Sequence, residues 1–205
     1  MKYYVVWKGR TPGLYTSWAE CEAQVKSFPG AEYKSFDSRA AAEEALRGNY
    51  ADYKGQRTTT LSPARLIAIG QPIVPSYAVD AACEANPGPL EYRCVETATR
   101  REIFHQGPFE HGTNNVGEFL AIVHALALFQ KKDITAPIYS DSRNALKWVR
   151  EKQCKTRLKR DEWNAELFEL IERAEAWLQR NDYATRILKW ETKAWGENPA
   201  DFGRK

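Results

Sequence analysis

Residues 77–83 read YAVDAAC, a short apolar run that a single acid, Asp80, interrupts. The small and β-branched residues on both sides of the acid predict a buried strand. An ionised carboxylate in such a run is costly unless it is paired with a cation or bound to a metal ion. No basic residue stands next to Asp80 along the chain. The run therefore predicts a strand of the fold and, within it, the first ligand of a metal site.

Three further acids stand in comparable surroundings. Glu118 lies in an apolar helical pattern, and no charged residue follows it at the third, fourth or seventh position. Asp141 ends a strand pattern, a place that ligands favour, and Asp201 opens the C-terminal segment. Taken singly, Asp141 could cap the helix that follows it and Asp201 could lie in a solvated first turn. Together, the four acids predict an oxygen-rich cage for Mg²⁺ or Mn²⁺.

Hydrophobic periodicity predicts a larger domain in the last two thirds of the chain. Three strands in a meander begin at residue 73 and are followed by a long helix from about residue 116. The later elements are a strand at 136–141, helices at 142–152 and 161–180, and a strand at 185–191. This order favours an α/β (α+β) fold in which helices flank a mixed sheet.

The first third of the chain predicts a separate small α+β module. Its strands are expected at 3–7, 14–17 and 32–36, and its helices at 18–27 and 38–46. Residues 49–72 mix Gly, Thr, Gln, Pro and charged residues without a clear period, which is typical of a linker, although residues 62–69 could form a short helix. We therefore predict a first domain at 1–48, a linker at 49–72 and a second domain at 73–205.

Four motifs of the larger domain carry a resemblance to a known family. They are residues 77–88, the segment GTNNVGE at 112–118, YSDS at 139–142 and WGENPAD at 195–201. In order and spacing they resemble type 1 ribonuclease H, and the hairpin signal NPGP at 86–89 agrees with it. The resemblance implies a ribonuclease H-like mixed five-stranded sheet with flanking helices.

The resemblance also implies an activity. The expected enzyme is an endoribonuclease that hydrolyses the RNA strand of RNA/DNA hybrids with two Mg²⁺ ions, or Mn²⁺, and leaves 5′-phosphate products. Asp80, Glu118, Asp141 and Asp201 would bind the ions, with Asp80 bridging both. Glu197 stands in the loop where many relatives carry a histidine and a subset of bacterial members carries glutamate, so it would assist catalysis. A solvated loop acid is the alternative interpretation of Glu197.

The first module resembles the hybrid-binding, or viroplasmin-like, domain in YYVVWKGR at 3–10, GLYTSW at 13–18 and YKSF at 33–36. The resemblance implies that Tyr4 and Trp18 pack on deoxyribose and that Lys34 grips a DNA phosphate. Ser35 stands where some relatives have a second lysine. An aromatic residue such as Trp18 could instead belong to the core.

The resemblance and the local charge also indicate nucleic-acid contacts in the larger domain. Asn86 and Asn115 would approach the RNA strand, while Thr113 and Asn115 would hold the DNA strand. Arg143 replaces a glutamine of similar relatives. A run of basic residues at 152–160 begins one helical turn after Trp148. Such a run is either a solvated surface or a binding site for phosphate. The remaining expected contacts are Thr156, Arg157, Thr192 and Arg204.

Composition limits the possible partners. The chain has 205 residues and a formal net charge of +3, so a nucleic-acid footprint has to be a local patch. The four cysteines lack metal-site spacing, and no long apolar segment indicates a signal peptide or membrane span, so we expect a cytoplasmic protein with free thiols and no membrane contact. The expected partner is an RNA/DNA hybrid, with weaker binding of double-stranded RNA and a monomeric state.

Two other function classes compete with this interpretation. A non-catalytic RNA/DNA hybrid-binding protein would be expected to lack one of the four acids, and none is missing. A transposase- or exonuclease-like relative would use the same carboxylate chemistry. The hybrid-binding resemblance and the turn at Thr113-Asn114-Asn115 argue against it.

Overall fold

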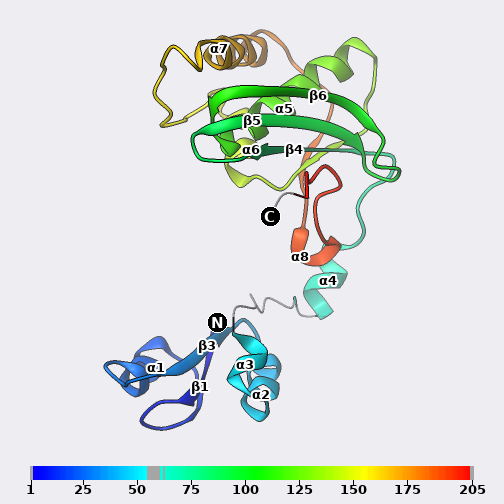
Figure 1. Ribbon diagram of the computed structural model, residues 1–205. Helices are drawn as coiled ribbons and strands as arrows, with labels where there is room; N and C mark the ends of the chain where they lie inside the picture. The colour runs from blue at the N-terminus through cyan, green and yellow to red at the C-terminus, as the bar shows by residue number, and fades with distance from the viewer. Residues whose placement is uncertain (1, 55–60, 62, 204–205) are drawn as a thin grey trace. The chain divides into compact units, whose positions relative to one another are not determined.

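The chain folds into two compact units, Met1–Gly70 and Gln71–Lys205 (Figure 1). In this computed structural model, residues 2–54, 61 and 63–203 are described. Each unit has its own sheet and its own hydrophobic core. The chain therefore has two folded parts.

The first unit is built on a three-stranded antiparallel sheet in the order β2-β1-β3. Helices pack on both faces, around Val5 and Phe36 on one side and around Val6 and Cys21 on the other. The elements are β1 (Tyr3–Lys8), β2 (Gly13–Tyr15), α1 (Trp18–Val25), β3 (Glu32–Phe36), α2 (Arg39–Arg47), α3 (Tyr50–Tyr53) and α4 (Pro63–Ile69). They agree with the α+β module that the sequence predicts.

Ordered structure in this unit continues past residue 48, where the sequence places the start of a linker. The helix α3 follows at once, and the ring of Tyr53 stacks on Trp7 with centroids 5.6 Å apart. The indole Nε1 of Trp7 donates to the carbonyls of Ala45 at 3.0 Å and Gly48 at 2.9 Å. These contacts tie α3 to the sheet, although its four residues are too few to show a helical period in the sequence.

The second unit contains a mixed five-stranded sheet in the order β6-β5-β4-β7-β8. Strands β4 to β6 form an antiparallel meander, whereas β7 runs parallel to both β4 and β8. The elements are β4 (Tyr77–Cys83), β5 (Gly88–Glu96), β6 (Glu102–Gly112), α5 (Asn114–Lys131), β7 (Ile138–Ser140), α6 (Arg143–Arg150), α7 (Ala165–Arg180), β8 (Ile187–Lys189) and α8 (Thr192–Trp195). This topology confirms the predicted fold class.

The main core lies between this sheet and the helices α5, α6 and α7. Its centre is α5, which is apolar nearly all round and buries Phe119, Ile122 and Phe129 completely. A smaller cluster covers the other face of the sheet, where Ala78 and Tyr139 meet residues of the C-terminal segment such as Ala200. The C-terminal segment is thereby held close to β4 and β7.

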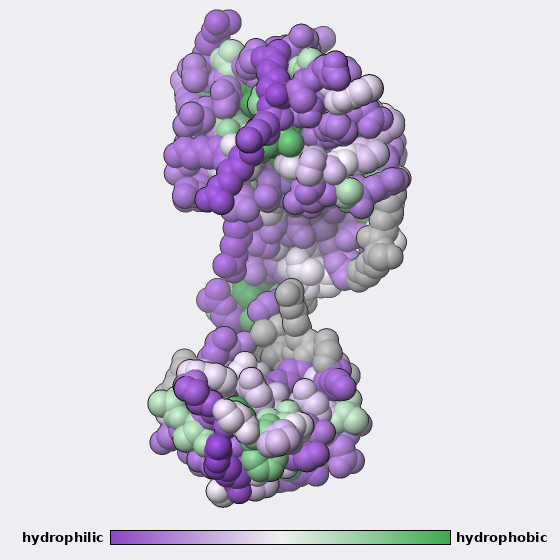
Figure 2. All heavy atoms as spheres, turned by 60° about the vertical axis from the view of Figure 1, so that its left-hand side comes forward, coloured by the Kyte–Doolittle hydropathy of each residue, from purple (hydrophilic) through white to green (hydrophobic). Residues whose placement is uncertain are grey.

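Hydrophilic residues dominate the face of the second unit that is visible in Figure 2. In the described part of the chain, none of the helices has the length and apolar character needed to cross a membrane. All four cysteines are free, as the sequence predicts.

Candidate active site

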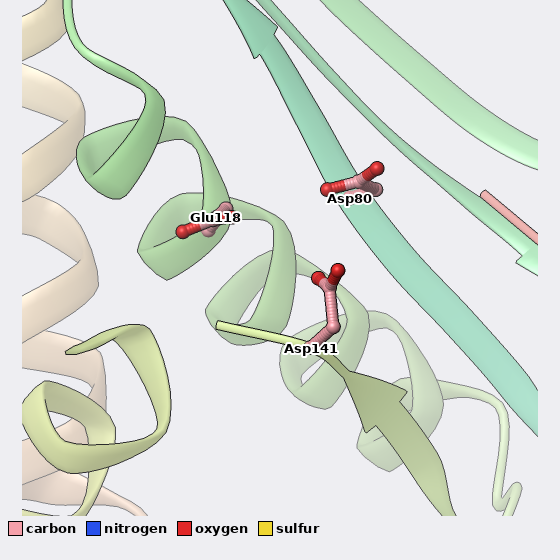
Figure 3. A group of neighbouring side chains, drawn as sticks. All are labelled: Asp80, Glu118 and Asp141. Carbon is pink, nitrogen blue, oxygen red and sulfur yellow. The ribbon is translucent and has the colours of Figure 1, made fainter. Parts of the chain in front are cut away.

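Three of the four predicted acids meet at one place in the second unit. Asp80 projects from β4, Glu118 from α5 and Asp141 from the end of β7 (Figure 3). One carboxylate oxygen from each lies within 4.8 Å of those of the other two. The chain thus gathers three oxygen ligands from elements that are far apart in sequence.

Strand geometry and helix capping place two of these acids. Side chains alternate along β4, so Asp80 emerges opposite its core neighbours Val79 and Ala81, on the face that the C-terminal segment covers. Asp141 follows β7 directly, and the hydroxyl of Ser142 caps α6 by accepting from the N–H of Ala145 at 3.2 Å. Because Ser142 provides the cap, capping does not explain the presence of Asp141.

Close packing of α5 sets the position of Glu118. A side chain at the preceding Gly117 would place its Cβ 2.6 Å from Leu90 and 2.7 Å from Ala81, so glycine lets the helix lie against β4 and β5. Glu118 is only 8% exposed, and the amide of Asn114 donates to its Oε1 at 3.3 Å. The side chain of Glu118 is therefore turned into the protein.

Burial and nearby negative charge oppose the ionisation of Asp80 and of Glu118. Burial, followed by the charges of Asp141, Glu118 and Asp201, raises the pKa of Asp80 to about 8, although the N–H of Ala81 opposes the rise. Burial likewise raises the pKa of Glu118 to about 7. A hydrogen bond with Ser142 and the positive charge of Lys189 act in the opposite direction. A cation bound between the acids would relieve this repulsion.

The fourth acid, Asp201, lies close to the group but outside it. Its charge contributes to the raised pKa of Asp80, while its Oδ1 accepts from the N–H of Gly203 at 2.5 Å. The 4.8 Å cluster therefore contains three acids, whereas the sequence predicts four together. The role of Asp201 as a metal ligand stays a prediction.

Two residues that sequence reasoning missed hold the segment with Asp201. Arg93 donates to the carbonyls of Ala200 at 2.9 Å and Asp201 at 2.7 Å, and its guanidinium lies 4.5 Å from the ring centre of Phe202. The amide of Asn198 donates to the carbonyl of Val79 at 2.9 Å. Asn198 also reaches Oδ1 of Asp141 at 3.5 Å, so it links the segment to the acid cluster.

Arg93 is a basic neighbour of Asp80 across the sheet, although none stands next to Asp80 along the chain. In the β4–β5 hairpin, Arg93 is the residue directly opposite Asp80, although its guanidinium reaches to the C-terminal segment. Counting the strand pairs back from the NPGP turn would have revealed this partner. The turn signal Asn198-Pro199 was the available hint for Asn198.

A polar cavity of about 780 Å³ lies in the same unit and gathers six of the nine nucleic-acid contacts that the sequence predicts for this unit. Thr113 is the N-cap of α5, yet its hydroxyl makes no capping bond and lines the cavity instead. The predicted residues along the wall are Asn86, Thr113, Asn115, Trp148, Thr156 and Arg157. Sequence reasoning missed Asn144, which also lines the wall and donates to Oδ1 of Asn115 at 3.1 Å.

Comparison with known proteins identifies the family. The family model for RNase H matches residues 75–189, which is more than half of the chain. The chain belongs to the ribonuclease H family. A second family model, described as the Ribonuclease H1 N-terminal domain, matches residues 2–46. Both matches agree with the two resemblances found in the sequence.

Individual members of the ribonuclease H family match parts of the chain. Ribonuclease H of Schizosaccharomyces pombe is 43% identical over 63 residues, which cover 28% of this chain and 24% of that protein. Ribonuclease H of Saccharomyces cerevisiae is 29% identical over 97 residues, covering 47% of this chain and 26% of that protein. The chain thus spans about a quarter of the length of these two relatives. The crystal structure of RNase H1 from Halobacterium salinarum shares 21% identity, with a TM-score of 0.37 over 56% of this chain and 83% of that one.

The unit that matches the ribonuclease H1 N-terminal domain carries a group of three neighbouring aromatic side chains, of which Trp18 and Tyr33 are exposed and Tyr4 is half-buried. The ring centroids of Tyr4 and Trp18 are 5.6 Å apart, and those of Trp18 and Tyr33 are 5.8 Å apart. Trp18 is 44% exposed, so it lies on the surface and not in the core. Tyr33 was missed, although it alternates with the inward-facing residues of β3.

Lys34 does not join this aromatic group. It pairs with Val5 in the sheet and faces the opposite side, where its ammonium donates to the carbonyl of Tyr53. Burial lowers its pKa. Lys34 and Tyr4 therefore lie on opposite faces of the sheet, because neighbouring strand residues point to opposite faces. The phosphate contact of Lys34 stays a prediction.

The other predicted contacts of this ribonuclease H family member lie apart from the polar cavity. Arg143 lines a second hollow at the start of α6, and Thr192 begins the short helix α8. Glu197 is exposed between α8 and Asn198, so its accessory role stays a prediction. Arg204 lies outside the described residues.

Proposed function

We propose that this chain is an endoribonuclease that hydrolyses the RNA strand of RNA/DNA hybrids and leaves 5′-phosphate products. The observation that carries the proposal is the largely buried cluster of Asp80, Glu118 and Asp141 within the ribonuclease H family match. Such a cluster is costly to a fold unless a ligand compensates the charge.

The donor set fits two Mg²⁺ ions, with Mn²⁺ as a substitute. Asp80, Glu118 and Asp141 offer only carboxylate oxygens, which hard divalent cations prefer. Burial and nearby acids raise the pKa of Asp80 and of Glu118, and a bound cation would favour their charged forms. Asp201 would complete the site as the fourth ligand. When bound, the ions supply an activated water and stabilise the leaving oxygen.

The protein's own contribution is position. Asn198 holds Asp141 relative to β4, and Arg93 fixes the backbone on which Asp201 stands. Glu197 stands at the exposed end of the same segment, where it would assist release of the product. These residues keep the ligands in place before substrate arrives, which lowers the cost of organising them during the reaction.

The polar cavity supports a nucleic-acid substrate. Its amides and hydroxyls, at Asn86, Thr113 and Asn115, suit sugar and phosphate oxygens, and Arg157 adds positive charge. Groups of this kind recognise the backbone and the shape of a duplex and not its base sequence. We therefore infer recognition of the hybrid by its helical form and its 2′-hydroxyl groups.

The first unit would raise affinity for the hybrid. The exposed rings of Trp18 and Tyr33, with the half-buried Tyr4 beside Trp18, offer a stacking surface for sugars or bases. The match to the Ribonuclease H1 N-terminal domain supports this binding role.

The test uses an RNA/DNA hybrid with either strand labelled at its 5′ end, beside RNA/RNA and DNA/DNA duplexes, with Mg²⁺ and with EDTA. We expect Mg²⁺-dependent cuts in the RNA strand of the hybrid alone, and products that ligate only through a 5′-phosphate. Cuts in the DNA strand or cuts that persist in EDTA would overturn the proposal. Tight hybrid binding without cleavage in either Mg²⁺ or Mn²⁺ would favour a binding protein.

A further inference from the structure

A second hollow, which we call the basic hollow, opens beside the acid cluster. It measures about 510 Å³, and its wall consists of Arg143, Leu146, Lys147, Arg150 and Glu151 from the region of α6 together with Lys189 at the end of β8. The polar cavity uses Asn144 and Trp148 of the same helix. Because consecutive residues of a helix are turned by roughly 100°, the two hollows occupy neighbouring faces of α6.

The basic hollow concentrates positive charge. Its four cations and one carboxylate give a net charge of +3, as large as the formal net charge of the whole chain. The carboxylate of Glu151 lies 3.9 Å from Lys147 and 3.0 Å from Lys155, so it is shared with a residue outside the hollow. Among the described residues, Arg143, Arg150 and Lys189 have no acidic partner in a salt bridge. Cations crowded in this way are stabilised by a polyanion.

The hollow adjoins the place where the strand would be cut. Arg143 begins α6 only two residues after Asp141. The charges of Asp141 and Glu118 act on Lys189, and so does the repulsion from Arg143. A backbone that leaves the acid cluster along this side of α6 would therefore meet Arg143 and Lys189 first, and Lys147 and Arg150 further along.

We propose that the basic hollow binds phosphates of the RNA strand beyond the phosphate that reacts. This inference rests on the proposed function, because it assigns a substrate contact to that enzyme. With the DNA backbone held at Thr113 and Asn115 in the polar cavity, α6 would lie between the two backbones of the hybrid.

Salt dependence gives the first test. Each phosphate that the protein no longer neutralises makes the slope of log K against log salt shallower by about 0.7–0.9. The double variant Lys147→Gln with Arg150→Gln is measured against a fluorescent hybrid in EDTA, where no strand is cut. We expect its slope to be shallower by about 1.5 and its binding on the order of tenfold weaker near 0.1 M salt. Both side chains are exposed, so the variant should fold normally.

A matched control is the double variant Lys131→Gln with Lys132→Gln. These two exposed lysines stand at the end of α5 and line neither hollow, so the same loss of charge should leave the slope unchanged. An unchanged slope in the Lys147 and Arg150 variant, or an equal loss in the control, would overturn the inference.

Neutral linkages identify the strand. With methylphosphonates in the RNA strand, the wild type and the Lys147 and Arg150 variant should bind the hybrid with equal affinity. The neutral linkage and the substitution each remove one partner of the same ion pair, so the second change costs nothing more. The same linkages in the DNA strand should preserve the difference. If only the DNA linkages remove it, the hollow does not bind the cut strand. If the wild type neither binds nor cuts the hybrid, the proposed function itself fails.

Discussion

Replacing Asp80 by asparagine should stabilise the metal-free protein at alkaline pH, because the acid cluster opposes its own ionisation. The folded state raises the pKa of Asp80 from 3.8 to about 8. The folded protein therefore binds a proton that the unfolded chain has already released between these two values. The contribution of Asp80 protonation to the free energy of unfolding is fully present below about pH 4 and decreases as the pH rises towards 8. Above about pH 8 this contribution is lost.

The size of the effect follows from the shift. At about 1.4 kcal/mol per pKa unit, a rise from 3.8 to about 8 corresponds to a loss on the order of 5 kcal/mol for the wild type. Asparagine has no charge to lose, so Asp80→Asn escapes this loss. The free energy of unfolding of Asp80→Asn should exceed that of the wild type only slightly near pH 4. Above about pH 9 the excess should approach about 5 kcal/mol.

Urea unfolding of both proteins in EDTA, near pH 4 and above about pH 9, measures this advantage. The control is Asp182→Asn, which neutralises an exposed acid and should change little at either pH. Added Mg²⁺ should then stabilise the wild type and not Asp80→Asn. Equal stability of the wild type and Asp80→Asn at alkaline pH would refute the idea that Asp80 is buried among uncompensated charges.

Three further substitutions address the neighbouring residues. Arg93→Met should speed hydrogen exchange at residues 200–203, because methionine cannot donate to the carbonyl of Ala200 or of Asp201. It should also raise the Mg²⁺ concentration needed for half-maximal cleavage several-fold. The surface variant Arg101→Gln should have neither effect. Glu197→Ala should slow turnover more than hybrid binding, and unchanged steady-state rates would remove Glu197 from the mechanism. Trp18→Ala should weaken hybrid binding and processivity without changing cleavage at a single site, and an equal affinity in a gel-shift titration would contradict the stacking role.

Local pattern was sufficient for most of the fold. The apolar run around Asp80 and the strand that stops at Asp141 have the composition and length of buried strands, and both are strands of the sheet. Glu118 lies in an apolar helical pattern with no charged residue at the third, fourth or seventh following position, and its side chain is buried in the structure. These features depend on residues close together in the chain, which is why the sequence reveals them.

Contacts between distant segments could not be predicted in the same way. Arg93 meets the C-terminal segment more than one hundred residues later, and Asn198 joins that segment to β4. The side of β3 on which Lys34 lies depends on strand register, and one step of register exchanges the two faces. The short helix α3 is defined by its packing on Trp7 and has no periodic signal of its own.

Cleavage of a labelled RNA/DNA hybrid by the wild type, Asp141→Asn and Asp182→Asn in Mg²⁺ tests most directly whether the acid cluster is a catalytic metal site. Asp141 lies in the 4.8 Å cluster, whereas Asp182 is exposed and outside it, so each variant removes one carboxylate charge from a different setting. We expect RNA-strand cuts by the wild type and by Asp182→Asn, and none by Asp141→Asn at equal protein stability. Undiminished cleavage by Asp141→Asn would contradict the assignment of these acids to catalysis.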